Sequence, residues 1–210
     1  MSKALILMIL GCISLISCQQ ADKSNELMKK AMDVYLFSES SEEVKLDSSL
    51  SLTNMALKVD DENISAYAHK AMLLFRKKDI HGLLETNSKM QELRPTKPFY
   101  VAQRALYYEL DGDSLKSEDY YKRALREYEK YLEQDSLDFN LRLEYIGILE
   151  SYGDTVSASS NLQRMRQFDY PEEQREILEF YEPNAAWKEQ LLKFWNGELE
   201  YDEIQNRLSG

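Results

Sequence analysis

Apolar residues recur along most of the chain at the spacing of one face of an α-helix. The clearest run follows the i, i+3, i+4, i+7 pattern and consists of Tyr121, Ala124, Leu125, Tyr128, Tyr131 and Leu132. This run predicts a helix that continues to about Gln134. The sequence holds only 7 Gly and 4 Pro, too few chain-breaking residues for a protein built of strands and turns. The pattern therefore predicts an all-α fold.

The helical pattern also recurs along the chain at a fixed spacing of about 34 residues, which we call the repeat offset. The positions that share this offset alternate between large, small and turn residues: Tyr67 with Val101, Ala71 with Ala105, and Asp79 with Asp113. The spacing and residue order resemble the tetratricopeptide repeat (TPR), a helix-turn-helix unit with a period of about 34 residues. The resemblance implies a helical solenoid in which Ala71 and Ala105 lie where the two helices of a unit cross. An irregular all-helical bundle is the alternative.

The spacing from Asp113 to Asp154 is longer than the repeat offset, and we call it the longer offset. It is longer because the helix predicted to end at about Gln134 continues past the position where a repeat normally ends. We expect three to four repeats and C-terminal capping helices. A Ser-rich, acidic connection at 38–43 is expected to join the predicted helices 25–37 and 47–59. The predicted repeats cover about 25–63, 64–97, 98–137 and 138–171, and the cap covers 172–210, with helices expected at 172–181, 185–195 and 198–208.

The N-terminus has the order of an export signal. Lys3 is followed by an apolar stretch from Ala4 to Ile16, which is too short for a membrane-spanning helix. It ends in Leu15-Ile16-Ser17-Cys18, which resembles the lipobox of bacterial lipoprotein precursors. The resemblance implies removal of the signal peptide 1–17 and lipidation of the Cys18 thiol. An ordinary secretory signal or a buried apolar helix is the alternative.

The segment 18–24 is polar and short, which suits a tether between the lipid and a helical domain at 25–210. Gln19 follows the lipidated position, whereas the enterobacterial retention signal has Asp there. The resemblance therefore implies the cell envelope and its outer membrane, with the periplasmic or surface face left open. Cys12 leaves with the signal and Cys18 carries lipid, so no thiol remains for a disulfide or a catalytic site.

The net charge and the motifs of the sequence argue against several kinds of function. With 26 Lys and Arg against 37 Asp and Glu, the net charge is −11, which argues against a nucleic-acid partner. His69 and His81 are the only histidines and lack further ligands at metal spacing, so we expect no metal. No phosphate-binding loop, dinucleotide fingerprint or serine-nucleophile elbow is present, so we expect no cofactor and no enzymatic activity.

Charge is unevenly distributed along the chain. The segment Ile64 to Lys97 carries seven basic and three acidic residues, whereas Pro171 to Gly210 carries four basic and ten acidic residues. A solvated surface explains this in the simplest way. The alternative is that the middle repeat favours an acidic partner segment.

In the TPR family, the first helix of each unit faces a concave groove. The family pattern places eight residues of a partner-binding groove on this chain: Ser65, His69, Met72, Arg76, Phe99, Gln103, Leu106 and Glu109. The Lys and Asn residues of the family's carboxylate clamp are absent at these positions. The expected groove is mixed and apolar, suited to a helix or an extended peptide with hydrophobic anchor residues.

These patterns predict a lipid-anchored envelope protein that acts as a non-enzymatic protein-protein interaction adaptor. Its expected partners are another protein or peptide and, through lipid on Cys18, the membrane. A narrower alternative is an accessory lipoprotein of outer-membrane protein assembly, secretion or glycan uptake. An envelope hydrolase that uses a buried carboxylate pair is the alternative from a different class.

Overall fold

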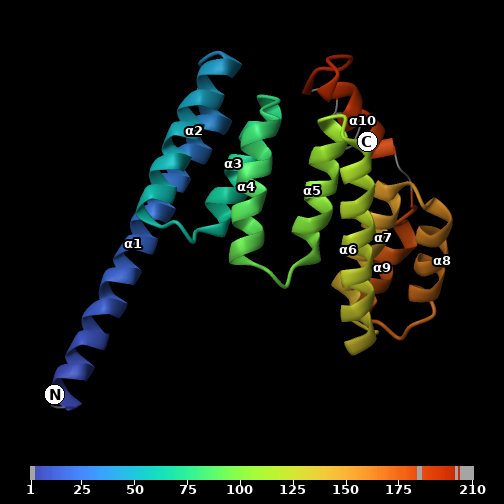
Figure 1. Cartoon of the computed structure of the whole chain (residues 1–210), viewed down its shortest axis with the longest axis horizontal. Helices are drawn as coiled ribbons and strands as arrows, with labels where there is room; N and C mark the ends of the chain where they lie inside the picture. The colour runs from blue at the N-terminus through green and yellow to red at the C-terminus, as the bar shows by residue number, and fades with distance from the viewer. Residues whose placement is uncertain (1–2, 184–185, 202, 204–210) are drawn as a thin grey trace. The chain divides into compact units, whose positions relative to one another are not determined.

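The computed structural model describes residues 3–183, 186–201 and 203, with side chains from residue 20 onward. It divides into two compact units, residues 1–93 and 94–210. All regular elements in the described residues are helices (Figure 1). They are α1 (Lys3–Phe37), α2 (Glu42–Val59), α3 (Ile64–Arg76), α4 (Ile80–Leu93), α5 (Pro98–Leu110), α6 (Ser114–Gln134), α7 (Phe139–Tyr152), α8 (Thr155–Met165), α9 (Glu172–Phe180) and α10 (Ala186–Trp195).

The predicted all-α class is confirmed, and α6 ends at Gln134 as its long apolar run predicts. α2 begins at Glu42, ahead of the predicted start at Asp47, because Glu42 and Glu43 occupy its first turn, where carboxylates favour the helix dipole. The connection between α1 and α2 is therefore shorter than the sequence predicts. The last predicted helix, 198–208, falls largely outside the described residues.

The first helix is the largest difference from the expected elements. α1 runs without a break from Lys3 to Phe37, so the expected tether 18–24 is helical here. No glycine or proline interrupts that segment, and nothing in its sequence ends a helix. Ser24 at its end is fully buried, and its hydroxyl donates to the Ala56 carbonyl at 3.1 Å. Among the side chains that the structure describes, Ser24 is therefore the first along the chain to be buried.

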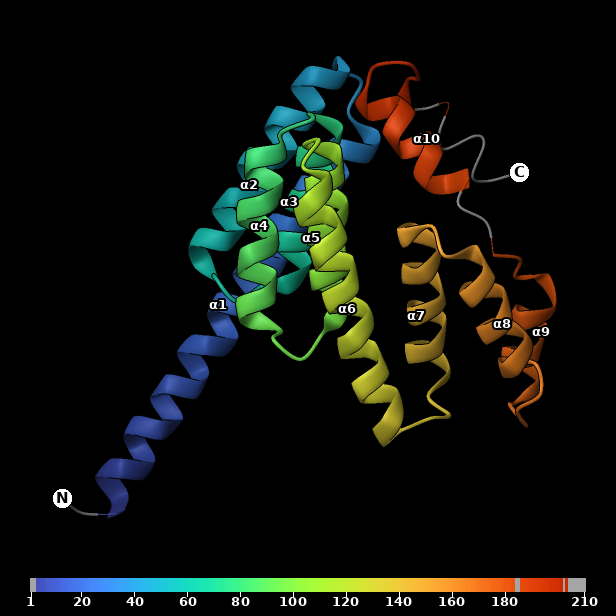
Figure 2. The ribbon, with the colours of Figure 1, turned by 45° about the vertical axis from the view of Figure 1, so that its right-hand side comes forward.

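Small residues let α1 and α2 pack closely as an antiparallel pair. The Ser49 hydroxyl of α2 donates to the Ala31 carbonyl at 2.8 Å, which mirrors the bond from Ser24 to Ala56 in the opposite direction. Ala31 and Ala56 have no exposed surface. In Figures 1 and 2 the N-terminal part of α1 continues past the end of α2.

The turns inside the helix pairs α3–α4, α5–α6 and α7–α8 are built alike. In each, an aspartate amide donates to a carbonyl near the end of the preceding helix: Asp79 to Leu74 at 3.0 Å, Asp113 to Tyr108 at 2.9 Å, and Asp154 to Leu149 at 2.8 Å. The same aspartates accept at Oδ1 from an amide in the first turn of the next helix: Gly82 at 2.9 Å, Lys116 at 3.1 Å and Ser157 at 2.9 Å. The turns at Asp79 and Asp113 are one repeat offset apart, and the turn at Asp154 follows at the longer offset. All three have the same hydrogen-bond geometry.

The position before each of these aspartates adopts a left-handed backbone. Gly112 and Gly153 have φ of 81° and 98°, and Lys78 has φ of 55° at the equivalent place in the first pair. Gly197, which follows α10, also has a positive φ, of 78°.

The turns that connect one pair to the next also recur at the repeat offset and then at the longer offset. In each, the amide of the residue before a helix donates to a carbonyl at the start of the turn: Asn63 to Asp60 at 3.4 Å, Lys97 to Arg94 at 3.1 Å, and Asp138 to Asp135 at 3.5 Å. Two kinds of turn therefore alternate along the chain from Asp60 to Asp154.

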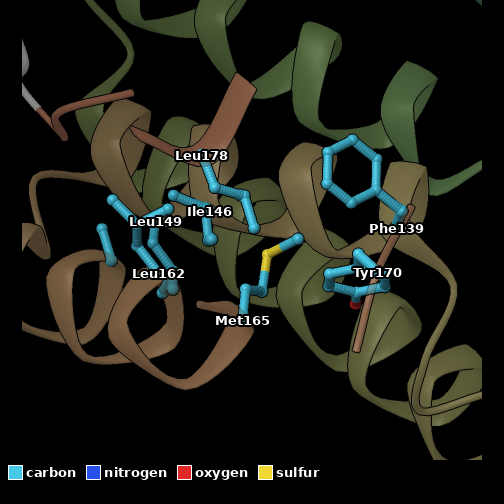
Figure 3. Packing of buried hydrophobic residues seen from close by; sticks show 8 residues of the cluster. Phe139, Ile146, Leu149, Leu162, Met165, Tyr170 and Leu178 are labelled. Atoms are coloured by element: carbon cyan, nitrogen blue, oxygen red, sulfur yellow. The ribbon is translucent and has the colours of Figure 1, made fainter. Parts of the chain in front are cut away.

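The core of the second unit has two parts. α5, α6 and α7 bury a set of aliphatic and aromatic residues that includes Ala105, Tyr121 and Ala124. The second part, shown in Figure 3, joins α7, α8 and α9 and includes Phe139, Ile146, Leu149, Leu162, Met165, Tyr170 and Leu178. Tyr170 meets the edge of the Phe139 ring at 5.1 Å between centroids. α9 is thus held by its own buried Leu178, whose carbonyl also accepts from Arg166.

Candidate functional site

The expected groove residues fall in both units, four on α3 and four on α5. On α3, Ser65 is exposed and Met72 is half-buried. His69 and Arg76 are engaged within the first unit: His69 Nε2 lies 3.0 Å from the Ser49 hydroxyl, and Arg76 forms an ion pair with Glu42 at 2.7 Å. These two groove residues therefore contact α2.

Tyr35 of α1 joins His69 and Arg76 into one cluster. Its ring meets the His69 ring edge-on at 6.0 Å, and the Arg76 guanidinium lies over the ring at 5.3 Å and also donates to the tyrosine hydroxyl. Burial lowers the pKa of His69 below its ordinary value of 6.5, so the imidazole stays neutral at pH 7. The structure thus assigns a packing role to two residues that the sequence places in a binding groove.

On α5, Gln103 and Leu106 are half-buried, and Phe99 is 44 % exposed. Phe99 meets the neighbouring Tyr100 edge-on at 5.6 Å. Glu109, near the end of α5, forms an ion pair with Lys188 of α10 at 2.9 Å. α10 therefore contacts one end of the expected groove row on α5.

Lys188 is held by more than its ion pair. Its ammonium also donates to the Ser151 carbonyl at 2.6 Å and lies 5.9 Å from the centre of the Tyr121 ring. Tyr121 in turn donates to Glu109 at 3.3 Å. Glu109, Tyr121 and Lys188 border a pocket of about 260 Å³, which Ser114, Ser117, Glu118 and Tyr152 also line. Sequence reasoning missed this contact because Lys188 is far along the chain from Glu109 and outside the repeat pattern.

The described residues show little that points to metal or acid-base chemistry. They contain no group of three or more His, Cys, Asp or Glu side chains that could hold a metal ion. Glu150 is a buried carboxylate, and the Tyr181 hydroxyl donates to it at 2.9 Å. This bond ties α7 to the end of α9 and gives the carboxylate a structural role.

The lipidation prediction concerns a side chain outside the described part, since only the backbone of Cys18 is described. Among the described residues, no helix has the length and apolarity needed to cross a membrane.

Comparisons with known proteins do not assign the chain to a family: no family model matches it, and no curated protein matches it.

Proposed function

We propose that this protein is a lipid-anchored, TPR-like helical-repeat adaptor of the bacterial envelope, which binds another protein and catalyses no reaction. The observation that carries the proposal is the alternation of two turn geometries, which recur first at the repeat offset and then at the longer one. A chain that repeats one helix-turn-helix unit builds its surface from equivalent helix faces, and such surfaces suit extended protein partners.

The packing at the positions where the two helices of a repeat are expected to cross supports the repeat interpretation. Ala71 and Ala105, at the predicted crossing positions, are 5 % and 0 % exposed, and Met90 and Ala124 are buried at the matching place on the second helices. Small residues at a crossing allow two helix backbones to approach closely. The residues that share an offset in the sequence thus share an environment in the fold.

The arrangement of α1 supports the anchor. The buried packing that the structure describes starts at Ser24, and the N-terminal part of α1 extends past α2 in Figures 1 and 2. Cleavage before Cys18 leaves Ser24 and its hydrogen bond to Ala56 intact. Cys18 then lies a short segment away from the packed domain. A lipid on that thiol holds the domain next to the bilayer and raises its effective concentration for membrane-bound partners.

Metabolic labelling with a radioactive fatty acid tests the anchor. The wild-type chain should incorporate label, and a Cys18→Ala variant should incorporate none. A Cys12→Ala variant is the matched control and should label normally, because Cys12 leaves with the signal peptide. An unlabelled wild-type chain would contradict the lipid anchor.

Purification of the full-length protein from detergent-solubilised envelopes, followed by mass spectrometry, tests partner binding. A protein should copurify in a fixed ratio and bind again when the two purified components are mixed. Phe99→Ser is a suitable variant because that side chain is 44 % exposed and its loss leaves the core unchanged. If no protein binds in reconstitution, the adaptor proposal is wrong.

A further inference from the structure

A pocket of about 390 Å³ lies in the first unit among α2, α3 and α4. Each helix contributes residues at the spacing of one helical face: Asn54, Leu57 and Lys58 from α2, Tyr67 and Lys70 from α3, and Glu85, Thr86 and Lys89 from α4. Its volume is in the range of small-molecule and side-chain binding sites. None of its lining residues is among the expected groove residues.

The pocket is positively charged in a protein whose net charge is −11. Three lysines line it against one glutamate, Glu85. Lys89 forms an ion pair with Glu92 at 2.7 Å, whereas Lys58 and Lys70 form no ion pair with any residue that the structure describes. Two ammonium groups at this pocket are therefore available to an anion.

The wall of the pocket contains a buried polar group without a partner. Thr86 is 1 % exposed, and its hydroxyl has no hydrogen-bond partner in the described part of the chain. An unpaired buried hydroxyl is unfavourable, and rotation of the Thr86 side chain toward a ligand that accepts its proton would remove that cost. Tyr67, also buried, provides an aromatic surface beside it.

We infer that this pocket is a binding site for a side-chain carboxylate of an acidic peptide segment. Lys58 and Lys70 form charge-assisted hydrogen bonds to the carboxylate, and the Thr86 hydroxyl donates to it. Leu57 and Asn54, one helical turn apart on α2, contact the peptide on either side of that residue. This inference rests on the proposed protein-binding function and adds the chemistry of the partner.

The lining residues favour a carboxylate over a phosphate. Phosphate sites in proteins usually add arginine forks or a helix N-terminus to their lysines, and no arginine lines the pocket. Glu85 at the pocket would repel a dianion more strongly than a monoanion, and it can accept a peptide N–H beside the bound carboxylate.

Fluorescence anisotropy with the full-length protein in neutral detergent tests the site. The probe is a labelled glutamate–serine peptide with an amidated C-terminus, and its glutamine–serine counterpart is the reference. The wild-type protein should bind only the glutamate peptide. A Lys58→Gln/Lys70→Gln variant should lose about tenfold or more in affinity, because two charge-assisted contacts disappear.

A control variant separates this site from general charge attraction. Lys23→Gln/Lys29→Gln makes the same change in net charge on exposed positions of α1, outside the pocket, and should bind the glutamate peptide as the wild type does. Equal losses in the two double variants would overturn the inference. Stronger competition by inorganic phosphate than by acetate, at constant ionic strength, would overturn the ligand class.

Thr86→Val tests the pocket without a change in charge. The substitution keeps the side-chain shape and removes the unpaired hydroxyl, so the melting temperature should not fall, while affinity for the glutamate peptide should fall about threefold or more. A purely structural role for Thr86 predicts the reverse, a lower melting temperature and unchanged affinity, and that result would overturn its place in the site.

Reconstitution with a purified partner distinguishes failure of the proposed carboxylate site from failure of the proposed adaptor function. If the wild type and Lys58→Gln/Lys70→Gln proteins reconstitute equally well with a purified partner, the adaptor function stands and this site is wrong. If the wild type reconstitutes with no protein but binds the glutamate peptide, the adaptor function fails and the carboxylate site stands.

Discussion

Tyr128 of α6 and Glu144 of α7 are joined by a hydrogen bond of 2.9 Å that the tyrosine hydroxyl donates. One position further along each helix the direction reverses, and Tyr145 of α7 donates to Glu129 of α6 at 2.9 Å. The Tyr128 and Tyr145 rings lie 6.3 Å apart. These two bonds set the register between α6 and α7, the helices at which the repeat offset gives way to the longer one.

Replacing Tyr128 with Phe should lower the free energy of unfolding by about 1 kcal/mol, because a buried hydroxyl loses its bond to a carboxylate. Burial, followed by the nearby Glu144 charge, raises the pKa of Tyr128 above its ordinary range, so the hydroxyl remains a donor at neutral pH. Urea titration measures the change. Tyr131→Phe, on the same helix, is the control and should change stability by less than about 0.5 kcal/mol. Equal effects would show that the bond to Glu144 contributes nothing.

The shared left-handed turn position predicts opposite effects for two substitutions. Gly153→Ala should destabilise by about 1 kcal/mol, because a Cβ there meets no neighbouring atom and the cost comes from the backbone alone. Lys78→Gly, at the matching position with φ of 55°, should stabilise by about 0.5 kcal/mol. Differential scanning calorimetry compares the two. A loss of stability in both variants would refute the equivalence of these turns.

His69 should make the first unit sensitive to mild acid. Because burial places its folded pKa below 6.5, the unfolded chain binds the proton more readily, and stability is complete above pH 6.5 and falls as the pH decreases below it. His69→Gln keeps a polar group near Ser49 and removes the titration. The difference in melting temperature between the wild type and this variant should therefore change between pH 7.5 and pH 5.5. The change should begin at about pH 6.5, the pKa of a histidine in the unfolded chain, and end at the lower pKa of His69 in the folded protein. A constant difference would mean that His69 does not titrate differently on folding.

Lys188 should hold α10 on the second unit. Lys188→Met keeps the aliphatic stem but removes the bonds to Glu109 and Ser151, so amide hydrogen exchange in α10 should accelerate about tenfold. Lys193→Met is the matched control, since Lys193 pairs with Glu189 inside the same helix. Unchanged exchange in Lys188→Met would show that other contacts hold the cap.

The elements of this fold could largely be read from local sequence. The repeat offset located the turns at Asp79 and Asp113, and the long apolar run of α6 located its end at Gln134. These features depend on residues close together in the chain, where spacing alone selects a face or a turn. The continuity of α1 was missed because a polar segment without Gly or Pro can extend a neighbouring helix.

The candidate site depended on the tertiary structure. Spacing placed His69, Arg76 and Glu109 in a groove, but Ser49, Glu42 and Lys188 engage them from other elements, and no local pattern links those partners. The same holds for the lysine pocket, where Lys58 and Lys70 matter because two helices bring them together beside a buried threonine. The sequence by itself determined most of the helices and their turns, and it predicts the export signal. Only the tertiary structure decided which polar groups are already paired and which remain open to a ligand, because pairing depends on distances between residues far apart in the chain.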